Sequence, residues 1–564
     1  MTILSHFPYP EVRQYQGDVI NLIEKHLDNY DYIFLEAPTG LGKSAIAYAL
    51  AKYMFNEREE LSHFVVADIY LQNQYLRDFP DLALIKGRNN FICKMPLNMM
   101  PKHCLEKLLK DENVLTCERA PCVSDPKYQC PFKPKYEKDE AGLLYDKYGV
   151  KMNWDDVPNK CPYWEQKDKA IRSPLTIHNY FYYLNEQNFA HSFSKRELGI
   201  FDEAHTIESI MMEFVQIPIT TWTLRRIQKY FERYYVPTQI PRYETLGEWS
   251  NWLLDLQSKL SEIINKMGSS EQIRKLSGEN LEQVEMTILV EGLLQKVNDM
   301  LAYIDENPDN WVFTKDDNAV IFKPVVISPY SQQLFGFTRK NVLVSATILD
   351  KDKLKSYLGI DEDVKFIRVS KSSFPVEHRP LYQKFIGKAV ANEMPLYRIK
   401  LLHALDYELI PPHLKYKGVI HTHTNDIANY IMENSKYKEY MVTSVGNVRA
   451  VSFEEFFASP PPCIMVTPSM KMGVDLKDDL ARWQVICKVP YPYLGDPQVA
   501  KRVKMDQGWY SWQTCMSIIQ TYGRVCRSDT DWGETYVLDS KFNDLYIQNR
   551  LMFPEWFSEA IRRV

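Results

Sequence analysis

A phosphate-binding loop near the N-terminus restricts the fold of this 564-residue chain more than any other feature. Residues 31–36 read as a short β-strand, residues 37–44 have the sequence Ala-Pro-Thr-Gly-Leu-Gly-Lys-Ser, and the helix-favouring residues 45–51 follow directly. A strand that enters such a loop and leaves it as a helix presents backbone N–H groups to phosphate oxygens. The arrangement predicts an α/β domain with a parallel sheet.

Several residues of this loop have a defined part in binding a nucleoside triphosphate. Lys43 and Ser44 begin the helix, so the Lys43 ammonium suits the β- and γ-phosphates and the Ser44 hydroxyl suits Mg²⁺. Ala37 stands where the general pattern has its first glycine. By itself the loop also permits a chance match or a different kind of NTPase. We expect the whole loop to bind ATP: Ala37, Pro38, Thr39, Gly40, Leu41, Gly42, Lys43 and Ser44.

A second, acidic motif follows another apolar strand. Residues 199–201 lead directly into Asp202-Glu203-Ala204-His205. Asp202 is suited to hold Mg²⁺ through water, and Glu203 to orient or deprotonate the attacking water. His205 would couple the γ-phosphate site to the rest of the protein. The alternative is a capped helix start with carboxylates near its positive end.

Two arginines near the C-terminus complete this set of candidate catalytic residues. In the stretch 520–527 (Gln-Thr-Tyr-Gly-Arg-Val-Cys-Arg), Arg524 and Arg527 are three residues apart, which predicts one face of a helix. Planar cations brought to the γ-phosphate by a second domain would stabilise the transition state. A surface salt-bridge pair is the alternative. Gln520 joins the two arginines as a candidate catalytic residue.

The length and the order of segments indicate more than one domain. The chain is several times longer than a usual single domain, so two to four domains are expected. A strand-like run at 64–67 extends the first α/β unit, and residues 210–305 favour helices. Strand-like runs then return at 418–420, 463–466 and 485–489. We therefore expect a helical insertion and a second α/β unit.

Composition excludes a membrane protein and leaves the partner open. No apolar run is long enough to cross a bilayer, and residues 1–6 lack the basic start and apolar core of an export signal. We expect an intracellular protein, in the cytoplasm or with the nucleoid. The net charge of −5 does not favour nucleic acid overall, although a local basic groove is sufficient for a motor.

Cysteines are concentrated in one segment. In a chain expected to stay in a reducing compartment, such clustering indicates metal ligands, catalysis or core packing and not disulfides. Six of the ten lie in this segment: Cys93, Cys104, Cys117, Cys122, Cys130 and Cys161. The other four have apolar or motif surroundings and are expected in the core: Cys463, Cys487, Cys515 and Cys526.

With these motifs in place, the chain resembles the superfamily 2 DNA helicases of the XPD and DinG type, which carry an iron–sulfur cluster. The resemblance covers nearly the whole chain. The N-terminal segment with Arg13 and Gln16 is similar to the adenine-sensing start of that family, and residues 71–74 are similar to its DNA-contacting motif. The other matches, in order, are Phe7-Pro8-Tyr9-Pro10, Lys86-Gly87-Arg88-Asn89-Asn90-Phe91-Ile92-Cys93, Ser345-Ala346-Thr347-Ile348, Ser373-Phe374-Pro375 with Arg379-Pro380, Ile420-His421-Thr422-His423-Thr424, and Ser469 with Gly473-Val474-Asp475.

The resemblance implies a two-lobed α/β motor with two RecA-like parallel-sheet domains, and with an Fe–S cluster domain and a helical arch inserted in the first. It implies ATP- and Mg²⁺-dependent movement along single-stranded DNA, generally 5′ to 3′, by a compact monomer without a nuclease domain. Gly473 and Asp475 would join Arg13 and Gln16 at the nucleotide. The expected domains are motor domain 1 at 1–88, 166–208 and 319–366, the Fe–S domain at 89–165, the arch at 209–318 and motor domain 2 at 367–564.

The same resemblance makes Cys93 and Cys161 the first and last ligands of a [4Fe–4S] cluster. Cys104 would be a bystander, and two of three remaining cysteines would complete the set: Cys117, Cys122 and Cys130. These three and Cys161 are separated by four, seven and thirty residues, whereas structural zinc favours close Cys-x₂₋₄-Cys pairs. Zinc and ordinary buried cysteines are the alternatives.

Three functions are compatible with these residues. The leading prediction is an ATP-dependent DNA helicase acting on single-stranded and forked DNA. The alternatives are an ATP-regulated factor that binds or remodels DNA structures, and an unwinder of RNA–DNA hybrids such as R-loops, since the sequence has no sugar-selective feature. Basic and aromatic side chains near the cysteines are candidates for strand contacts, or else solvated charges beside core aromatics: Lys86, Arg88, Phe91, Tyr163 and Trp164.

Overall fold

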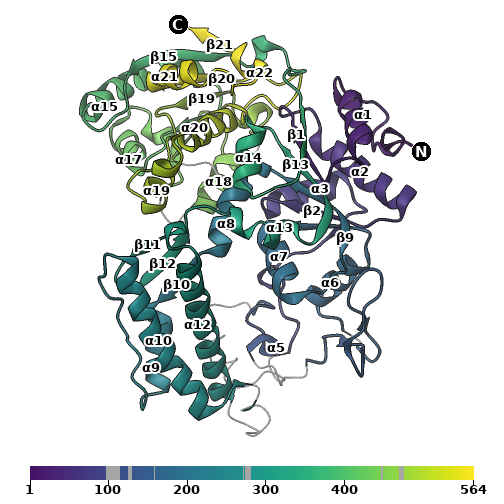
Figure 1. Cartoon of the computed structure of the whole chain (residues 1–564). Coiled ribbons are helices and arrows are strands. Elements are labelled where there is room, and N and C mark those ends of the chain that lie inside the picture. The colour runs from purple at the N-terminus through teal and green to yellow at the C-terminus, as the bar shows by residue number, and fades with distance from the viewer. Residues whose placement is uncertain are drawn as a thin grey trace.

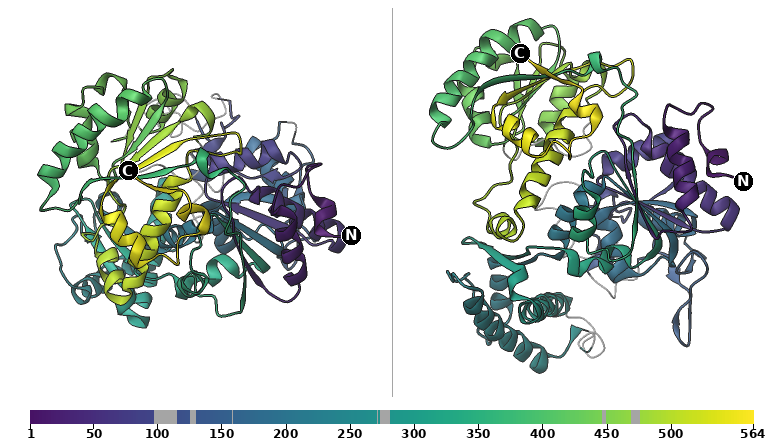
Figure 2. Two further views of the ribbon diagram at one scale, coloured as in Figure 1. Left: turned by 90° about the horizontal axis from the view of Figure 1, so that it is seen from above. Right: turned by 45° about the horizontal axis from the view of Figure 1, so that its top comes forward.

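Two seven-stranded parallel sheets form the two lobes of the chain (Figure 1). The computed structural model describes residues 1–96, 115–124, 130–157, 159–270, 272, 281–445, 449–468 and 476–564. The termini lie in different lobes (Figure 2). The predicted α/β class with two parallel-sheet units is confirmed.

The first lobe contains the phosphate loop. Its strands lie in the order β14-β1-β13-β9-β2-β8-β3. Strand β13 therefore lies between β1, which leads into the phosphate loop, and β9, which ends at the acidic motif. Strand β1 is buried along its whole length, as expected for a parallel strand covered on both faces. The strands are β1 (Tyr32–Glu36), β2 (Ser62–Val66), β3 (Ala83–Leu84), β8 (Leu175–Asn179), β9 (Arg196–Asp202), β13 (Thr338–Ser345) and β14 (Val364–Arg368).

Helices cover both faces of this sheet. On one face, α1 (Gln16–His26), α2 (Lys43–Arg58) and α3 (Ile69–Asp78) share a core with the strands. On the other, α7 (Tyr180–Asn185) and α8 (Ile207–Val215) belong to a larger core that continues into the second lobe. β14 pairs with β1 as far as Arg368, so the first sheet extends past the boundary expected at residue 366.

The segment between β9 and β13 projects from the first lobe (Figure 1). Its helices are α9 (Thr221–Tyr230), α10 (Leu246–Met267) and α12 (Leu281–Glu306), and a capping box of Thr245 and Glu248 begins α10. In the same segment, β10 (Ile217–Thr220), β11 (Trp311–Lys315) and β12 (Ala319–Pro324) form an antiparallel sheet. The boundary expected between residues 318 and 319 is wrong, because it would cut the β11–β12 hairpin.

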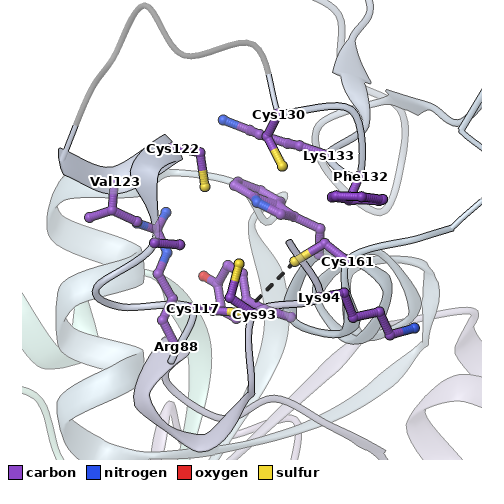
Figure 3. Close-up of a pocket in the computed structure, with 13 residues that line it drawn as sticks. Arg88, Cys93, Lys94, Cys117, Cys122, Val123, Cys130, Phe132, Lys133 and Cys161 are labelled. Carbon is purple, nitrogen blue, oxygen red and sulfur yellow. Dashed lines mark hydrogen bonds between the residues drawn. The ribbon is translucent and has the colours of Figure 1, made fainter. Parts of the chain in front are cut away.

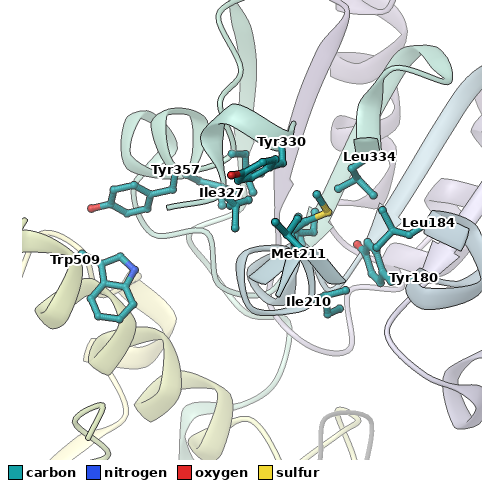
Figure 4. Close-up of a cluster of buried hydrophobic side chains, with 14 of the residues drawn as sticks. Tyr180, Leu184, Ile210, Met211, Ile327, Tyr330, Leu334, Tyr357 and Trp509 are labelled. Atoms are coloured by element: carbon teal, nitrogen blue, oxygen red, sulfur yellow. The ribbon is translucent and has the colours of Figure 1, made fainter. Parts of the chain in front are cut away.

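The second lobe has the strand order β17-β18-β16-β19-β20-β15-β21. Its helices α19 (Pro497–Met505) and α20 (Gln507–Tyr522) pack against the first lobe, where Trp509 of α20 lies beside Tyr357 (Figure 4). The strands are β15 (Leu381–Gly387), β16 (Gly418–His421), β17 (Met441–Thr443), β18 (Ile464–Thr467), β19 (Trp483–Ile486), β20 (Glu534–Asp539) and β21 (Ile561–Arg563).

Candidate nucleotide cleft and cysteine cavity

Glycine is required at two positions of the phosphate loop. Gly40 and Gly42 both have φ of 83°, in the left-handed region, and Gly42 is the N-cap of α2. A Cβ at Gly40 would lie 1.8 Å from the ring of Phe374. Ala37 is different: it is fully buried outside the left-handed region, and its N–H donates to the carbonyl of Ser345 at 3.1 Å. Alanine therefore fits where the general pattern has glycine.

Two side chains of the N-terminal segment, Arg13 and Gln16, form hydrogen bonds with the backbone of the phosphate loop. The Gln16 side-chain amide donates to the carbonyl of Leu41 at 2.6 Å and accepts from the N–H of Arg13 at 2.7 Å. The Arg13 guanidinium donates to the carbonyl of Gly40 at 2.8 Å. Gln16 is only 2% exposed, so its amide holds the loop backbone in place.

Lys43 lies across the loop, opposite the acidic motif. Its ammonium donates to the carbonyls of Ala37 at 3.1 Å and Pro38 at 3.3 Å. Burial lowers the pKa of Lys43, and the carboxylates of Glu203 and Asp202 oppose that shift.

The two carboxylates of the acidic motif are held differently. Asp202 ends β9; its Oδ1 accepts from the N–H of Glu203 at 2.9 Å and its Oδ2 from the Tyr75 hydroxyl at 2.8 Å. Burial raises the pKa of Asp202, and the neighbouring charge of Glu203 adds to this. For Glu203, burial acts in the same direction, but His205 and Lys43 outweigh it and the pKa is lowered. Glu203 has φ of 53°, a left-handed backbone typical of strained functional positions.

His205 connects the acidic motif with the second lobe. Its Nδ1 lies 3.0 Å from the Ser345 hydroxyl, 3.2 Å from Glu203 Oε2 and 3.4 Å from Nε2 of Gln520. Gln520, in the last turn of α20, also donates to the Thr347 hydroxyl at 2.6 Å. Gln520 of the second lobe thus contacts both His205 of the acidic motif and Thr347, which follows β13.

Part of this set lines one cleft of about 1050 Å³ between the lobes, whereas His205 and Gln520 are not among its lining residues. Lys43, Asp202, Glu203 and Arg527 all face it, together with Arg13 and Gln16. The side chains of the second lobe that line the cleft are Lys477, Asp478, Arg527 and Ser528. Gly473 and Asp475, expected at the nucleotide, lie outside the described residues.

The expected helix around the two arginines is wrong. Helix α20 ends at Tyr522 with Gly523 as its C-cap, and Cys526 has φ of 61°, so the chain turns sharply there. Arg527 lines the cleft, whereas Arg524 lies near the buried His421. Burial lowers the pKa of His421, and the charge of Arg524 also lowers it. The two guanidinium groups therefore do not share a helix face.

The segment expected to contact DNA also lines this cleft. Leu71, Asn73 and Gln74 of α3 face the cleft, whereas Gln72 is buried and donates to the carbonyl of Ile85 at 3.1 Å. This follows from the sheet order, since β2 lies directly beside β9. The cleft residues of α3 that the sequence did not single out are Tyr70, Tyr75, Arg77 and Asp78.

Five cysteines surround a separate cavity near α6 (Pro162–Arg172) (Figure 3). Sγ of Cys117 lies 3.9 Å from Sγ of Cys161, and this hydrogen bond lowers the pKa of Cys161 to about 6. A hydrogen bond from Cys122 lowers the pKa of Cys130 to about 7. The thiols on the cavity wall are Cys93, Cys117, Cys122, Cys130 and Cys161. Cys104 lies outside the described residues.

Three family models match successive parts of the chain. The model for the type III restriction enzyme res subunit matches residues 9–113, the DEAD_2 model matches residues 88–224, and the helicase C-terminal domain model matches residues 421–560. The first two matches contain the phosphate loop, the cysteines and the acidic motif. The third contains Gln520 and both arginines.

Full-length relatives and solved structures agree with these matches. A probable ATP-dependent helicase of Methanocaldococcus jannaschii is 23% identical over 96% of this chain and 93% of its own length. The ATP-dependent DNA helicase YoaA of Haemophilus influenzae is 21% identical over 94% of this chain and 91% of its own length. A solved XPD helicase shares the fold with a TM-score of 0.61 at 14% identity, covering 99% of this chain and 100% of its own. An XPD protein of S. tokodaii has a TM-score of 0.53 at 13% identity, with 98% and 100% covered.

Over nearly its whole length the chain is similar to ATP-dependent helicases, and it shares the fold of solved XPD helicases. Its cleft lies between two parallel-sheet lobes, the RecA-like arrangement of solved XPD helicases. In the described part of the chain, no helix is both long and apolar enough to cross a membrane.

The cysteine cavity fits an iron–sulfur group by its donor chemistry. Thiolates are the protein ligands of [4Fe–4S] clusters, and the described cavity wall carries thiols with neither carboxylate nor imidazole. Arg88, Lys94 and Lys133 also line it and would offset anionic thiolates. Among the described residues, no three or more Cys, His, Asp or Glu side chains are arranged to hold a metal ion.

Most aromatic side chains near this cavity are core residues. Tyr163 and Trp164 are each 5% exposed, and the Arg88 guanidinium lies 5.1 Å and 5.7 Å from their ring centroids. These two rings are therefore not available to stack on bases, contrary to one of the two sequence interpretations. Lys86 donates to Asn73 at 2.9 Å. The four cysteines expected in the core are buried: Cys463, Cys487, Cys515 and Cys526.

Proposed function

We propose that this helicase translocates on single-stranded DNA from 5′ to 3′ and unwinds duplex DNA. The observation that supports it best is the cleft itself, where Lys43 and the carboxylates of one lobe face Arg527 of the other. A helicase relative named as a DNA helicase aligns over 94% of the chain, which supports DNA as the substrate. A cleft closed by two lobes lets each round of nucleotide binding and release change their separation.

Within this cleft each residue has a proposed role in hydrolysis. Glu203 orients or deprotonates the attacking water, and its lowered pKa keeps it in the ionised form that either role requires. Lys43 and Arg527 stabilise negative charge on the γ-phosphate as the bond breaks. When bound, Mg²⁺ would neutralise the β- and γ-phosphates, and Ser44 and Asp202 would hold it.

Gln520 and His205 are proposed to report the state of the nucleotide to the second lobe. His205 contacts Glu203 on one side and Ser345 on the other, and Gln520 reaches both His205 and Thr347. His205 therefore lies between Glu203 and Gln520, where a change at Glu203 on hydrolysis can alter the contact with α20. Arg524 is assigned a supporting role near His421, and Gly473 and Asp475 remain proposed nucleotide contacts.

We further propose that the cysteine cavity holds a [4Fe–4S] cluster. Cys93 and Cys161 are the proposed outer ligands, with two of Cys117, Cys122 and Cys130. When bound, the cluster would cross-link a segment that has little core of its own. The protein is proposed to act as a monomer inside the cell.

The polarity and the substrate are tested together by strand separation. Purified protein with ATP is expected to unwind a duplex with a 5′ single-stranded tail and to leave a matched 3′-tailed duplex intact. Lys43→Ala should leave both duplexes intact. Strong DNA-stimulated ATP hydrolysis without unwinding would instead favour a DNA-binding clamp, and faster separation of a 5′-tailed RNA–DNA hybrid would favour a hybrid unwinder.

A further inference from the structure

Both oxygens of the Asp202 carboxylate are oriented by protein donors. Oδ1 accepts from the N–H of Glu203 at 2.9 Å, and this donor comes from the next residue along the chain. Oδ2 accepts from the Tyr75 hydroxyl at 2.8 Å, and this donor comes from a residue 127 positions away. Each oxygen keeps a lone pair for a further partner in the cleft. The direction of that carboxylate therefore depends on where Tyr75 lies.

Tyr75 is held rigidly by its own surroundings. It is 2% exposed on α3, and its ring packs edge-on against Phe64 of β2 at 5.9 Å and beside Phe79 at 6.0 Å. Asp68 caps the N-terminus of α3 by accepting from the N–H of Leu71 at 2.9 Å. A phenol fixed by packing on both sides loses little entropy when it donates a hydrogen bond.

We propose that Tyr75 is a positioning residue that orients the Asp202 carboxylate for Mg²⁺, and this rests on the role proposed above for Asp202. Hydrogen bonds from surrounding residues fix the direction of a metal ligand, and their loss typically weakens metal affinity by about 10- to 100-fold. Tyr75 therefore sets the affinity for the Mg²⁺–nucleotide complex through the direction of the Asp202 carboxylate.

The chain offers a matched control. The Tyr180 hydroxyl donates to the main-chain carbonyl of the same Asp202 at 2.9 Å, and Tyr180 is also fully buried. Tyr180→Phe removes a buried phenol hydrogen bond to the same residue but leaves the carboxylate in place. Tyr75→Phe and Tyr180→Phe are therefore expected to lower the melting temperature to a similar extent and to differ in their Mg²⁺ dependence.

The test is equilibrium binding of a fluorescent, non-hydrolysable ATP analogue to the full-length protein as Mg²⁺ is varied. In Tyr75→Phe the Mg²⁺ concentration at half-maximal binding should rise roughly tenfold, with binding in a chelator unchanged. Tyr180→Phe should keep the wild-type midpoint. Replacement of Tyr75 by 3-fluorotyrosine, which keeps the ring and the hydroxyl, should also keep it and serves as the reference if Tyr75→Phe folds poorly.

Two results would overturn the inference, and a third would overturn its basis. A wild-type midpoint in Tyr75→Phe, or equal shifts in both phenylalanine variants, would mean that Tyr75 does not act through the carboxylate. If Asp202→Asn kept the wild-type midpoint, the proposed role of Asp202 would fail as well, which separates the two claims.

Discussion

The pKa values of the two carboxylates in the acidic motif, Asp202 and Glu203, are shifted in opposite directions, which suits them to different roles. Burial raises the pKa of Asp202, whereas the contact with His205 and the cations of the cleft lower the pKa of Glu203. A group that must deprotonate water benefits from staying ionised, and a group that holds a cation is neutralised when the cation binds. Two adjacent acids thus divide the roles through their surroundings.

The raised pKa of Asp202 predicts weaker Mg²⁺ binding as the pH falls. Mg²⁺ requires the ionised carboxylate, and that form is lost at a higher pH than for an ordinary aspartate. We expect the Mg²⁺ concentration at half-maximal nucleotide binding to rise between about pH 8 and about pH 6. A titration of analogue binding at both values measures this, and identical midpoints would contradict it.

A methyl group at Gly40 should destabilise the loop. In Gly40→Ala the new Cβ would meet Phe374, and alanine in a left-handed backbone costs roughly 1–2 kcal/mol even without the clash. Gly247→Ala in α10 is the control, because its Cβ would meet no atom within 4 Å. Chemical denaturation should show lower stability in the first variant and unchanged or higher stability in the second. Equal stabilities would mean that Phe374 moves aside at no cost.

At the scale of elements, helices α19 and α20 join the lobes through a buried carboxylate. Glu208, in the first turn of α8, accepts from Arg502 at 3.0 Å, from Trp509 at 3.0 Å and from Gln513 at 2.9 Å. Arg502 and Glu208 are 4% and 3% exposed. The helix that follows the acidic motif is therefore tied to α20, the helix that carries Gln520.

Breaking this ion pair should loosen the lobes. Removal of one partner from a buried pair typically costs about 3–5 kcal/mol, because the other charge stays buried. Glu208→Gln and Arg502→Met should each be strongly destabilising, and the double variant less so than their sum. Denaturation of the four proteins of this cycle gives the coupling. The exposed pair Arg242 and Asp317 is the control, and equal coupling at both sites would contradict the account.

The sequence predicted local elements well and contacts between distant elements poorly. The strand, loop and helix around Lys43 follow from residues adjacent in the chain, and the structure has them as β1 and α2. The turn after Tyr522 does not follow from the three-residue spacing of Arg524 and Arg527, because Gly523 ends the helix before both arginines. Tyr75 and Glu208 could not be predicted, since their partners lie 127 and 294 residues away and depend on strand order and lobe packing.

At the scale of the whole molecule, the cysteine cavity is a unit separate from the nucleotide cleft. Its thiols come from α5 (Pro121–Ser124), from the chain on both sides of that helix and from the residue before α6, so the cavity brings together residues from 93 to 161. A group bound there would act on folding of this segment and not directly on hydrolysis.

Iron content should therefore follow the cavity cysteines. In protein purified without oxygen, Cys93→Ser and Cys161→Ser are expected to lose iron and the visible absorption of the cluster. Among variants of Cys117, Cys122 and Cys130, one should keep its iron. Cys526→Ser, in the core of the second lobe, is the control and should keep wild-type iron. Colourless, zinc-containing wild-type protein would refute the cluster.

The central claim is that both lobes build one catalytic cleft, and the Arg527→Ala variant tests it most directly. The measurement is the rate of ATP hydrolysis with and without single-stranded DNA, with Arg550→Ala on the exposed surface of the same lobe as control. We predict DNA-stimulated hydrolysis in the wild type and in Arg550→Ala, and a loss of roughly 10³-fold or more in Arg527→Ala with nucleotide still bound. Wild-type hydrolysis by Arg527→Ala would contradict the account.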